Sequence, residues 1–320
     1  MEVLLTGAAG FIGFHAAKRL LAEGHQVIGV DNLNDYYTPA LKQARLAQLA
    51  DYPRFTFHQL DLSEKGALEA ALGEREITHI LHLAAQAGVR YSLENPHSYV
   101  QSNVMGHLNV LEYARHNNAL KHLAYASSSS VYGEREPGLG FKETDHVRAP
   151  ASLYAATKLS AEMLSESYTR LYDIPQTGLR FFTVYGPWGR PDMAYWIFSE
   201  KILKGEPITL FAPDVMKRDF TFIDDIVGIL PKLLDSPPSR HRLYNLGNSN
   251  PNTLLDFVVA IETACGVKAK TLIKPQQAGD VRTTFADISD AARDFGFAPK
   301  TTLEDGLSVF VAWYRDWQKV

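Results

Sequence analysis

The stretch TGAAGFIG at residues 6–13 constrains the fold of this chain more than any other feature. It follows EVLLT, which is typical of a buried β-strand, and leads into FHAAKRLLAEG, whose apolar residues recur at helical spacing. Gly7, Gly10 and Gly13 therefore lie at a turn from a strand into a helix. Glycines in this arrangement permit a sharp turn, close approach of a pyrophosphate and tight packing of the helix on the strand. The N–H groups that begin the helix then predict a site for phosphate groups.

Strands continue to alternate with helices through the first half of the chain. Strand-like stretches at 26–31, 55–62, 79–85 and 122–130 are separated by helical patterns, of which 98–117 is the longest. This predicts an α/β fold, a Rossmann-type doubly wound parallel sheet with helices on both faces. The second half is less regular and richer in proline, which favours a smaller mixed α/β domain that binds the substrate. We expect a dinucleotide-binding domain at 1–180 and a domain at 181–320 that is interleaved with it.

Composition excludes several classes of protein. A net charge of −4 over 320 residues argues against nucleic-acid binding. The single Cys265 rules out an internal disulfide framework and fits a reducing cytoplasm. We see neither a signal peptide nor a stretch long enough to cross a bilayer, so we expect no membrane partner. The histidines form no H-x-x-x-H pattern or Cys/His cluster, and we predict no catalytic metal.

Two acidic residues end predicted strands beside the glycine turn. Asp31 closes the second strand, where a carboxylate accepts hydrogen bonds from the ribose hydroxyls of an adenosine. Because the same carboxylate repels a 2′-phosphate, we predict NAD rather than NADP as the cofactor. Asp61 ends the third strand in a comparable place and is expected to face the adenine. The small residues of HLAAQAG, after the fourth strand, let a cofactor lie against the backbone.

A tyrosine and a lysine in SLYAATKLS form the second constellation. Tyr154 and Lys158 are at positions i and i+4, so both project from one face of a helix. An adjacent ammonium and a nicotinamide cation depress the pKa of a phenol, which is ordinarily about 10. The tyrosine is then able to exchange a proton with a sugar hydroxyl while a hydride moves to or from the nicotinamide.

Together these motifs resemble a known family. The stretches TGAAGFIG, HLAAQAG, SSSSVYG, YAATK and RDFTFIDDI resemble the extended short-chain dehydrogenase/reductases, in particular the NAD-dependent nucleotide-sugar epimerases, over essentially the whole chain. VDNLNDYYTPALKQARL, AAQAGVRYSLENPHSYV and FTVYGPWGRPDMA are most similar to UDP-glucuronate 4-epimerases. The chain departs from galactose-type epimerases at RFFT, where Thr183 replaces an asparagine.

The resemblance implies residues for cofactor and substrate. It places the catalytic hydroxyl on Ser128, beside Tyr154 and Lys158. The implied cofactor-binding residues are Gly7, Gly10, Phe11, Ile12, Gly13, Asp31, Asn32, Asp61, Leu62, Leu83, Ala84 and Ala85, together with Tyr154 and Lys158. The implied substrate-binding residues are Arg90, Ser128, Ser129, Thr183, Arg190, Arg218, Asp280 and Arg282. The resemblance also implies a homodimer formed through the helices that contain residues 98–116 and 152–172.

The residues leave alternative functions open. Related dehydratases and UDP-glucuronate decarboxylases carry an acidic residue before Val-Tyr-Gly, where this chain has Ser128, Ser129 and Ser130. Elimination of water requires an acid and a base near the reacting carbons, so the serines disfavour these reactions. We therefore expect NAD-dependent 4-epimerisation of UDP-glucuronate. A UDP-glucose or UDP-N-acetylglucosamine 4-epimerase, a UDP-glucuronate decarboxylase and a non-catalytic NAD-binding sensor are the alternatives.

Overall fold

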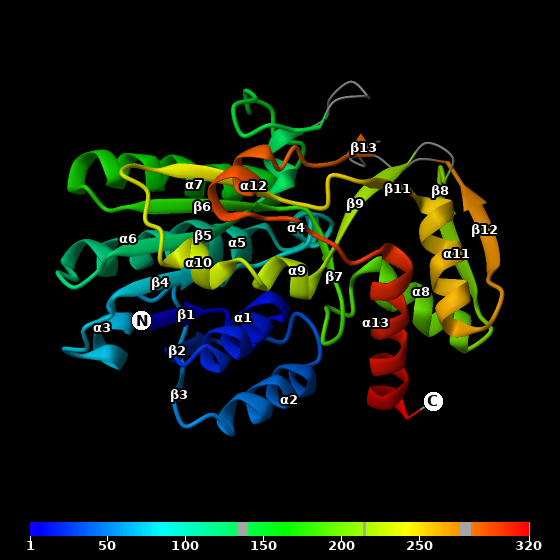
Figure 1. Ribbon diagram of the computed structural model, residues 1–320, viewed down its shortest axis with the longest axis horizontal. Coiled ribbons are helices and arrows are strands. Elements are labelled where there is room, and N and C mark those ends of the chain that lie inside the picture. The colour runs from blue at the N-terminus through cyan, green and yellow to red at the C-terminus, as the bar shows by residue number, and fades with distance from the viewer. Residues whose placement is uncertain (134–139, 214–215, 276–282, 320) are drawn as a thin grey trace. The chain divides into compact units, whose positions relative to one another are not determined.

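A computed structural model describes residues 1–133, 140–213, 216–275 and 283–319 of the chain (Figure 1). The chain divides into two compact units. The first consists of Met1–Gly133, His146–Phe181 and Val227–Tyr244, and the second of Glu134–Asp145, Phe182–Ile226 and Asn245–Val320.

The first unit is built on a seven-stranded sheet with the strand order β10-β6-β5-β4-β1-β2-β3. Its strands are β1 (Glu2–Thr6), β2 (Gln26–Asp31), β3 (Phe55–Gln59), β4 (His79–His82), β5 (His122–Ser128), β6 (Gln176–Phe181) and β10 (Arg242–Leu246). From β3 to β6 every neighbouring pair is parallel. The order 3-2-1-4-5-6 is that of the Rossmann fold, so the predicted fold is confirmed.

Helices cover both faces of this sheet (Figure 1). One group consists of α1 (Phe11–Ala22), α2 (Pro39–Ala50) and α10 (Leu230–Leu234), and the other includes α3 (Ala67–Leu72), α6 (Gly106–His116) and α7 (Leu153–Tyr172). Two short helices, α4 (Tyr91–Glu94) and α5 (Pro96–Tyr99), lie between β4 and α6. The apolar strands form the core with these helices; Leu4, Ile80 and Leu123 from the sheet and Leu111 from α6 are fully buried.

The strand order reverses between β1 and β4, which are hydrogen-bonded neighbours. In doubly wound sheets this point, outside the carboxyl ends of the strands, is where ligands bind. The glycine turn follows β1, and Leu83 and Ala84 follow β4, so both predicted cofactor segments lie at this edge.

Two local predictions need revision. The stretch 98–117 is helical up to His116, as predicted, but Val100–Met105 is wound as a π-helix before α6 begins. Within it, the buried Asn103 accepts a hydrogen bond from Gln86 N (2.8 Å) and donates one to Gln86 O (3.0 Å). Such π-turns are common at functional sites. In addition, β3 ends at Gln59, so Asp61 follows the strand instead of closing it.

The second unit contains two small sheets and five helices among its described residues. Its strands are β7 (Thr183–Tyr185), β8 (Pro207–Phe211), β9 (Lys217–Phe222), β11 (Pro251–Thr253), β12 (Lys270–Lys274) and β13 (Thr283–Thr284). Its helices are α8 (Ala194–Leu203), α9 (Ile223–Val227), α11 (Leu254–Cys265), α12 (Ser289–Phe295) and α13 (Leu303–Gln318). Strand β9 pairs with β7, β11 and β13, and β8 pairs with β12. Helices α11 and α13 pack on each other.

Candidate active site

The glycine turn is shaped so that only glycine fits at its key positions. Gly7 has φ +72°, and a Cβ there would lie 2.8 Å from the backbone nitrogen of Ala84. A Cβ at Gly13 would lie 2.0 Å from the carbonyl oxygen of Gly7. Helix α1 begins after Gly10, and no side chain among the described residues caps it; N–H groups at the start of a helix are a favourable site for a phosphate. These features fit the pyrophosphate of a dinucleotide.

Asp31 is held beside this turn by backbone hydrogen bonds. Its carboxylate accepts from Ala9 N at 3.2 Å and from Leu33 N at 2.9 Å, and the residue is only 9% exposed. A carboxylate oxygen is able to accept more than one hydrogen bond, so Asp31 still has acceptor capacity for ribose hydroxyls. The acceptor oxygens of Asp31 and their fixed position fit the ribose hydroxyls at the adenosine end of NAD.

Asn32 and Asp61 form a second fixed pair near the ends of β2 and β3. The Asn32 amide donates to Asp61 Oδ2 at 3.0 Å, and Ser63 N donates to Asp61 Oδ1 at 2.8 Å. Partial burial opposes ionisation, but these hydrogen bonds outweigh it and lower the pKa of Asp61. The neighbouring Leu62 is buried, and its carbonyl accepts from the amide of Asn109.

The remaining predicted cofactor residues line the same edge. After β4, Leu83 N donates to Thr6 O and Ala84 N to Thr6 Oγ1, which draws this segment against the end of β1. Leu83, Ala84 and Ala85 are half-buried. At the start of α1, Phe11 is buried and Ile12 half-buried.

Helix α7 presents the tyrosine and the lysine, as predicted. Ser152 caps the helix by accepting a hydrogen bond from Ala155 N, which places Tyr154 in its first turn. Tyr154 is half-buried, with its ring centroid 6.1 Å from that of Tyr99. Lys158 is 5% exposed and donates to the carbonyl oxygen of Ala126, on β5, at 2.9 Å. Burial lowers the pKa of Lys158 to about 8, and the charge of Glu162 opposes that shift.

The serine run is structured and its members differ. Ser128 caps the 3₁₀-turn Ser129–Tyr132: its Oγ accepts from Ser130 N at 3.2 Å and from Ser130 Oγ at 2.9 Å. Ser128 and Ser129 are half-buried. Ser127, by contrast, is buried and donates to Glu162 Oε1 at 2.5 Å. Strand alternation directs the side chains of Ser127 and Ser128 to opposite faces of the sheet.

Within the second unit, Arg190 lies in the loop that follows β7, which begins at Thr183. Its Nε and Nη2 donate to the two carboxylate oxygens of Asp192, at 3.0 and 2.6 Å. The preceding Trp188, at φ +59°, has its ring centroid 5.2 Å from that of Trp313 and 5.2 Å from that of Trp317. Packing against α13 therefore holds the loop that carries Arg190.

The other predicted substrate residues lie elsewhere on the chain, and two of them fall outside the described residues. Arg218, on β9, is half-buried, and its Nη1 donates to Lys217 O at 2.8 Å. Arg90 is exposed and precedes α4 in the first unit. Asp280 and Arg282 fall outside the described residues.

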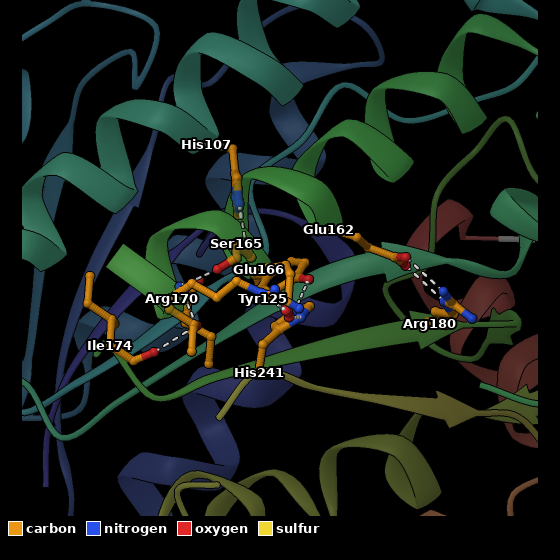
Figure 2. A network of polar contacts seen from close by, with 11 residues as sticks. His107, Tyr125, Glu162, Ser165, Glu166, Arg170, Ile174, Arg180 and His241 are labelled. Carbon is orange, nitrogen blue, oxygen red and sulfur yellow. Dashed lines mark hydrogen bonds and ion pairs between the residues drawn. The ribbon is translucent and has the colours of Figure 1, made fainter. Parts of the chain in front are cut away.

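A buried polar network in the first unit was not predicted. Figure 2 shows Glu162 facing Arg180, with His107 beside Ser165 in the same region. The signal that was overlooked is the position of Glu162, one helical turn after Lys158 on the same face of α7. Asn103 was also overlooked; its amide donates to Thr157 Oγ1 on α7 at 3.0 Å.

The described residues contain neither a metal-binding cluster nor a membrane-spanning helix. In residues 1–133, 140–213, 216–275 and 283–319, no group of three or more His, Cys, Asp or Glu side chains is arranged to hold a metal ion. Over the same part of the chain, no helix combines the length and the apolar character needed to cross a membrane.

Comparison with known proteins identifies the family. Residues 3–247 match the model of the NAD dependent epimerase/dehydratase family. The chain is 46% identical to UDP-glucuronate 4-epimerase 4 of Arabidopsis thaliana, over 98% of this chain and 75% of the relative. It is 46% identical to the probable UDP-glucuronate 4-epimerase of Rhizobium meliloti, over 98% of this chain and 97% of the relative.

A solved structure agrees with these relatives. The UDP-glucuronic acid 4-epimerase from Bacillus cereus, in complex with UDP-glucuronic acid and NAD, superposes with a TM-score of 0.93 at 33% identity, over 99% of this chain and 100% of that one. The predicted family is thereby confirmed: the chain belongs to the NAD dependent epimerase/dehydratase family.

Proposed function

We propose that this chain catalyses the NAD-dependent 4-epimerisation of UDP-glucuronate to UDP-galacturonate through a transient 4-keto sugar. The observation that carries the proposal is the match, over 98% of this chain, to relatives named UDP-glucuronate 4-epimerase. The glycine turn, the fixed Asp31 and the Tyr154–Lys158 pair are the features that such a reaction requires.

The first unit is assigned to the cofactor and the second mainly to the UDP-sugar. Gly7, Gly10 and Gly13 leave room for the pyrophosphate, and Asp31 accepts from the adenosine ribose. Asn32 and Asp61 lie toward the adenine, and Ala84 and Ala85 leave a flat backbone surface. When bound, NAD supplies a reversible acceptor for the hydride at C4 of the sugar.

Tyr154 is the proton-transferring group. Its phenolate takes the O4 proton as C4 is oxidised, and the resulting phenol returns that proton as C4 is reduced from the other face. The ammonium of Lys158 stabilises the phenolate, since an adjacent positive charge favours the ionised phenol. Ser128 hydrogen-bonds O4 and holds it next to Tyr154. Ser129, in the following turn, lines the same region.

Arg190 and Thr183 are assigned to the sugar carboxylate. The 4-keto form of glucuronate is a β-keto acid, which loses carbon dioxide when the breaking bond aligns with the carbonyl π system. A charge-assisted hydrogen bond from the guanidinium to the sugar carboxylate, with a threonine hydroxyl as a further donor, restrains that rotation. Arg218 and Arg282 are assigned to the diphosphate, Asp280 to the uridine ribose and Arg90 to the sugar.

A homodimer is also part of the proposal. Val100 and Met105 are each 43% exposed and Met163 is 57% exposed, and these large apolar side chains lie in the segments 98–116 and 152–172. Exposed apolar surface of this kind favours association. We expect Met163→Glu to convert a dimer to a monomer in light scattering; a monomeric parent protein would contradict the assignment.

The single Cys265, which is buried and has no disulfide partner, favours a cytoplasmic location.

Incubation of the purified protein with UDP-sugars tests the proposal. UDP-glucuronate, UDP-glucose and UDP-N-acetylglucosamine are supplied separately without added reductant, and the products are separated by chromatography. We expect UDP-galacturonate from the first and much slower conversion of the other two. Formation of a UDP-pentose as the main product, or preferential turnover of UDP-glucose, would overturn the substrate assignment.

A further inference from the structure

Glu162 is a fully buried carboxylate with a complete set of partners. Its exposed fraction is 0%, and that of Arg180 is 1%. Oε1 accepts from Ser127 Oγ at 2.5 Å and from Arg180 Nε at 2.8 Å, and Oε2 accepts from Arg180 Nη2 at 2.7 Å. Figure 2 shows this two-pronged contact between α7 and β6. Paired and hydrogen-bonded in this way, the buried charge of Glu162 is compensated.

These contacts join the elements that carry the reacting groups. Ser127 lies between Ala126, whose carbonyl accepts from Lys158, and Ser128. The Arg180 guanidinium lies 4.6 Å from the ring centroid of Tyr132, in the turn that follows Ser128. Glu162 therefore connects α7, the end of β5, β6 and the turn after Ser128.

The charges around Lys158 give Glu162 a second role. On α7 itself, Tyr154 and Glu162 lie one turn to either side of Lys158. The charge of Lys158 also acts on His82 of β4 and His107 of α6; burial lowers the pKa of both imidazoles, so they are neutral near pH 7. Strand β5 contributes the Ala126 carbonyl, and β6 contributes Arg180 through its pair with Glu162. Because Glu162 lies one turn from Lys158 on the same face of α7, its negative charge opposes deprotonation of Lys158.

We propose that Glu162 is a positioning residue for the reaction: it fixes the end of β5 against α7 and keeps Lys158 in its charged form beside Tyr154. The inference rests on the proposed function only in taking Tyr154, Lys158 and Ser128 as the reacting groups. A structural ion pair alone would contribute to folding without setting the protonation of Lys158.

Two variants that break the same ion pair distinguish these roles. Glu162→Gln removes the negative charge, and Arg180→Gln leaves it without its counter-charge. The pH at which Lys158 becomes half-deprotonated is measured by trace acetylation followed by peptide mass spectrometry. We expect this midpoint to fall by about one to two pH units in Glu162→Gln and to rise in Arg180→Gln. Midpoints that both stay unchanged, or that shift in one direction, would overturn the electrostatic role.

A double variant avoids an unpaired buried charge, which could stop the single variants from folding. A further variant, Ser127→Ala, tests the positioning role. The charge-neutral double variant Glu162→Gln/Arg180→Gln is expected to have a midpoint between that of the parent and that of Glu162→Gln, because it removes the stabilising carboxylate together with its counter-charge. Ser127→Ala retains the ion pair and cuts only the link to β5. We expect it to lower kcat about tenfold, with unchanged KM for UDP-glucuronate and an unchanged Lys158 midpoint. An unchanged kcat in Ser127→Ala would overturn the positioning role.

A matched control shows whether loss of any ion pair has the same effect as loss of the Glu162–Arg180 pair. The parent protein separates failure of this inference from failure of the proposed function. Lys204→Gln breaks the exposed Glu200–Lys204 pair (2.6 Å) and should change neither kcat nor the Lys158 midpoint. If the parent protein does not convert UDP-glucuronate, the proposed function fails. The acetylation midpoints then still decide whether Glu162 controls the protonation of Lys158.

Discussion

The Nζ atom of Lys158 lies 2.9 Å from the carbonyl oxygen of Ala126. This hydrogen bond joins helix α7, which carries Tyr154 in its first turn, to the strand that ends with Ser128. A buried ammonium without such partners would lose its proton readily. The contact therefore supports a charged Lys158 next to Tyr154, as the proposed proton transfer requires.

Removal of the Tyr154 hydroxyl should abolish turnover while NAD stays bound. Tyr154→Phe keeps the ring and takes away only the proton-transferring group, so we expect kcat to fall by about 100- to 10,000-fold. Ser128→Ala keeps the phenol and should lose less, about 10- to 1000-fold. Turnover is measured with UDP-glucuronate, and bound NAD is measured after denaturation. Near-normal turnover in Tyr154→Phe would refute the proton path.

Replacement of Asp31 should weaken NAD binding and reduce discrimination against NADP. Hydrogen bonds to charged groups contribute about 1.5–3 kcal/mol, so Asp31→Ser is expected to raise the Kd for NAD by about tenfold or more. The 2′-phosphate of NADP no longer meets a negative charge in this variant. Both affinities are measured by calorimetry on cofactor-depleted protein. The exposed Asp35→Asn, which removes a nearby carboxylate, is the control and should keep the parent preference.

Loss of Arg190 should affect substrates that carry a carboxylate. Arg190→Ala is expected to lower kcat/KM for UDP-glucuronate on the order of 100-fold and to release some carbon dioxide with a UDP-pentose. Thr183→Ala should show a weaker form of the same defect. Binding of UDP-glucose, which lacks the charge, is the control and should change little. Parent-like epimerisation without a pentose would place the carboxylate elsewhere.

Buried histidines make stability depend on pH. Burial lowers the pKa of His107 from 6.5 to about 3 and that of His79 from 6.5 to about 4. Below pH 6.5 the unfolded chain binds protons that the folded protein does not bind. The stabilisation from keeping each histidine neutral is therefore fully present above pH 6.5, and it is lost as the pH falls toward the pKa of the folded state. Each such histidine contributes a slope of up to about 1.4 kcal/mol per pH unit.

Urea unfolding between about pH 7 and about pH 5 measures this slope. His107→Gln should make the dependence on pH shallower, even though loss of the His107–Ser165 contact lowers the overall free energy of unfolding. His116→Gln replaces a histidine whose side chain is 66% exposed and should leave the slope unchanged. Equal slopes for all three proteins would show that His107 is not held neutral by burial.

Local patterns in the sequence predicted the parts of the site that depend on short-range geometry. The glycine turn is set by the spacing of Gly7, Gly10 and Gly13, and the common face of Tyr154 and Lys158 follows from the helical period. Asp31 was placed correctly because it directly ends a continuous apolar strand. The family and the fold followed from these motifs.

The parts that were missed depend on contacts between distant segments. Glu162 meets Arg180 and Ser127 only after β5, β6 and α7 have packed together. The π-turn Val100–Met105 accompanies hydrogen bonds from Asn103 to Gln86 and Thr157, which no local pattern contains. The pair Arg190–Asp192 is close in sequence, but the loop geometry that forms it depends on packing of Trp188 against α13.

Turnover of UDP-glucuronate labelled with deuterium at C4 tests the central claim most directly. The unlabelled compound in deuterated water is the control for exchange with solvent. Oxidation and reduction at C4 within one active site return the same hydrogen, so the account predicts UDP-galacturonate that keeps its deuterium at C4. Loss of the deuterium to solvent, or incorporation of solvent deuterium at C4 in the control, would contradict it.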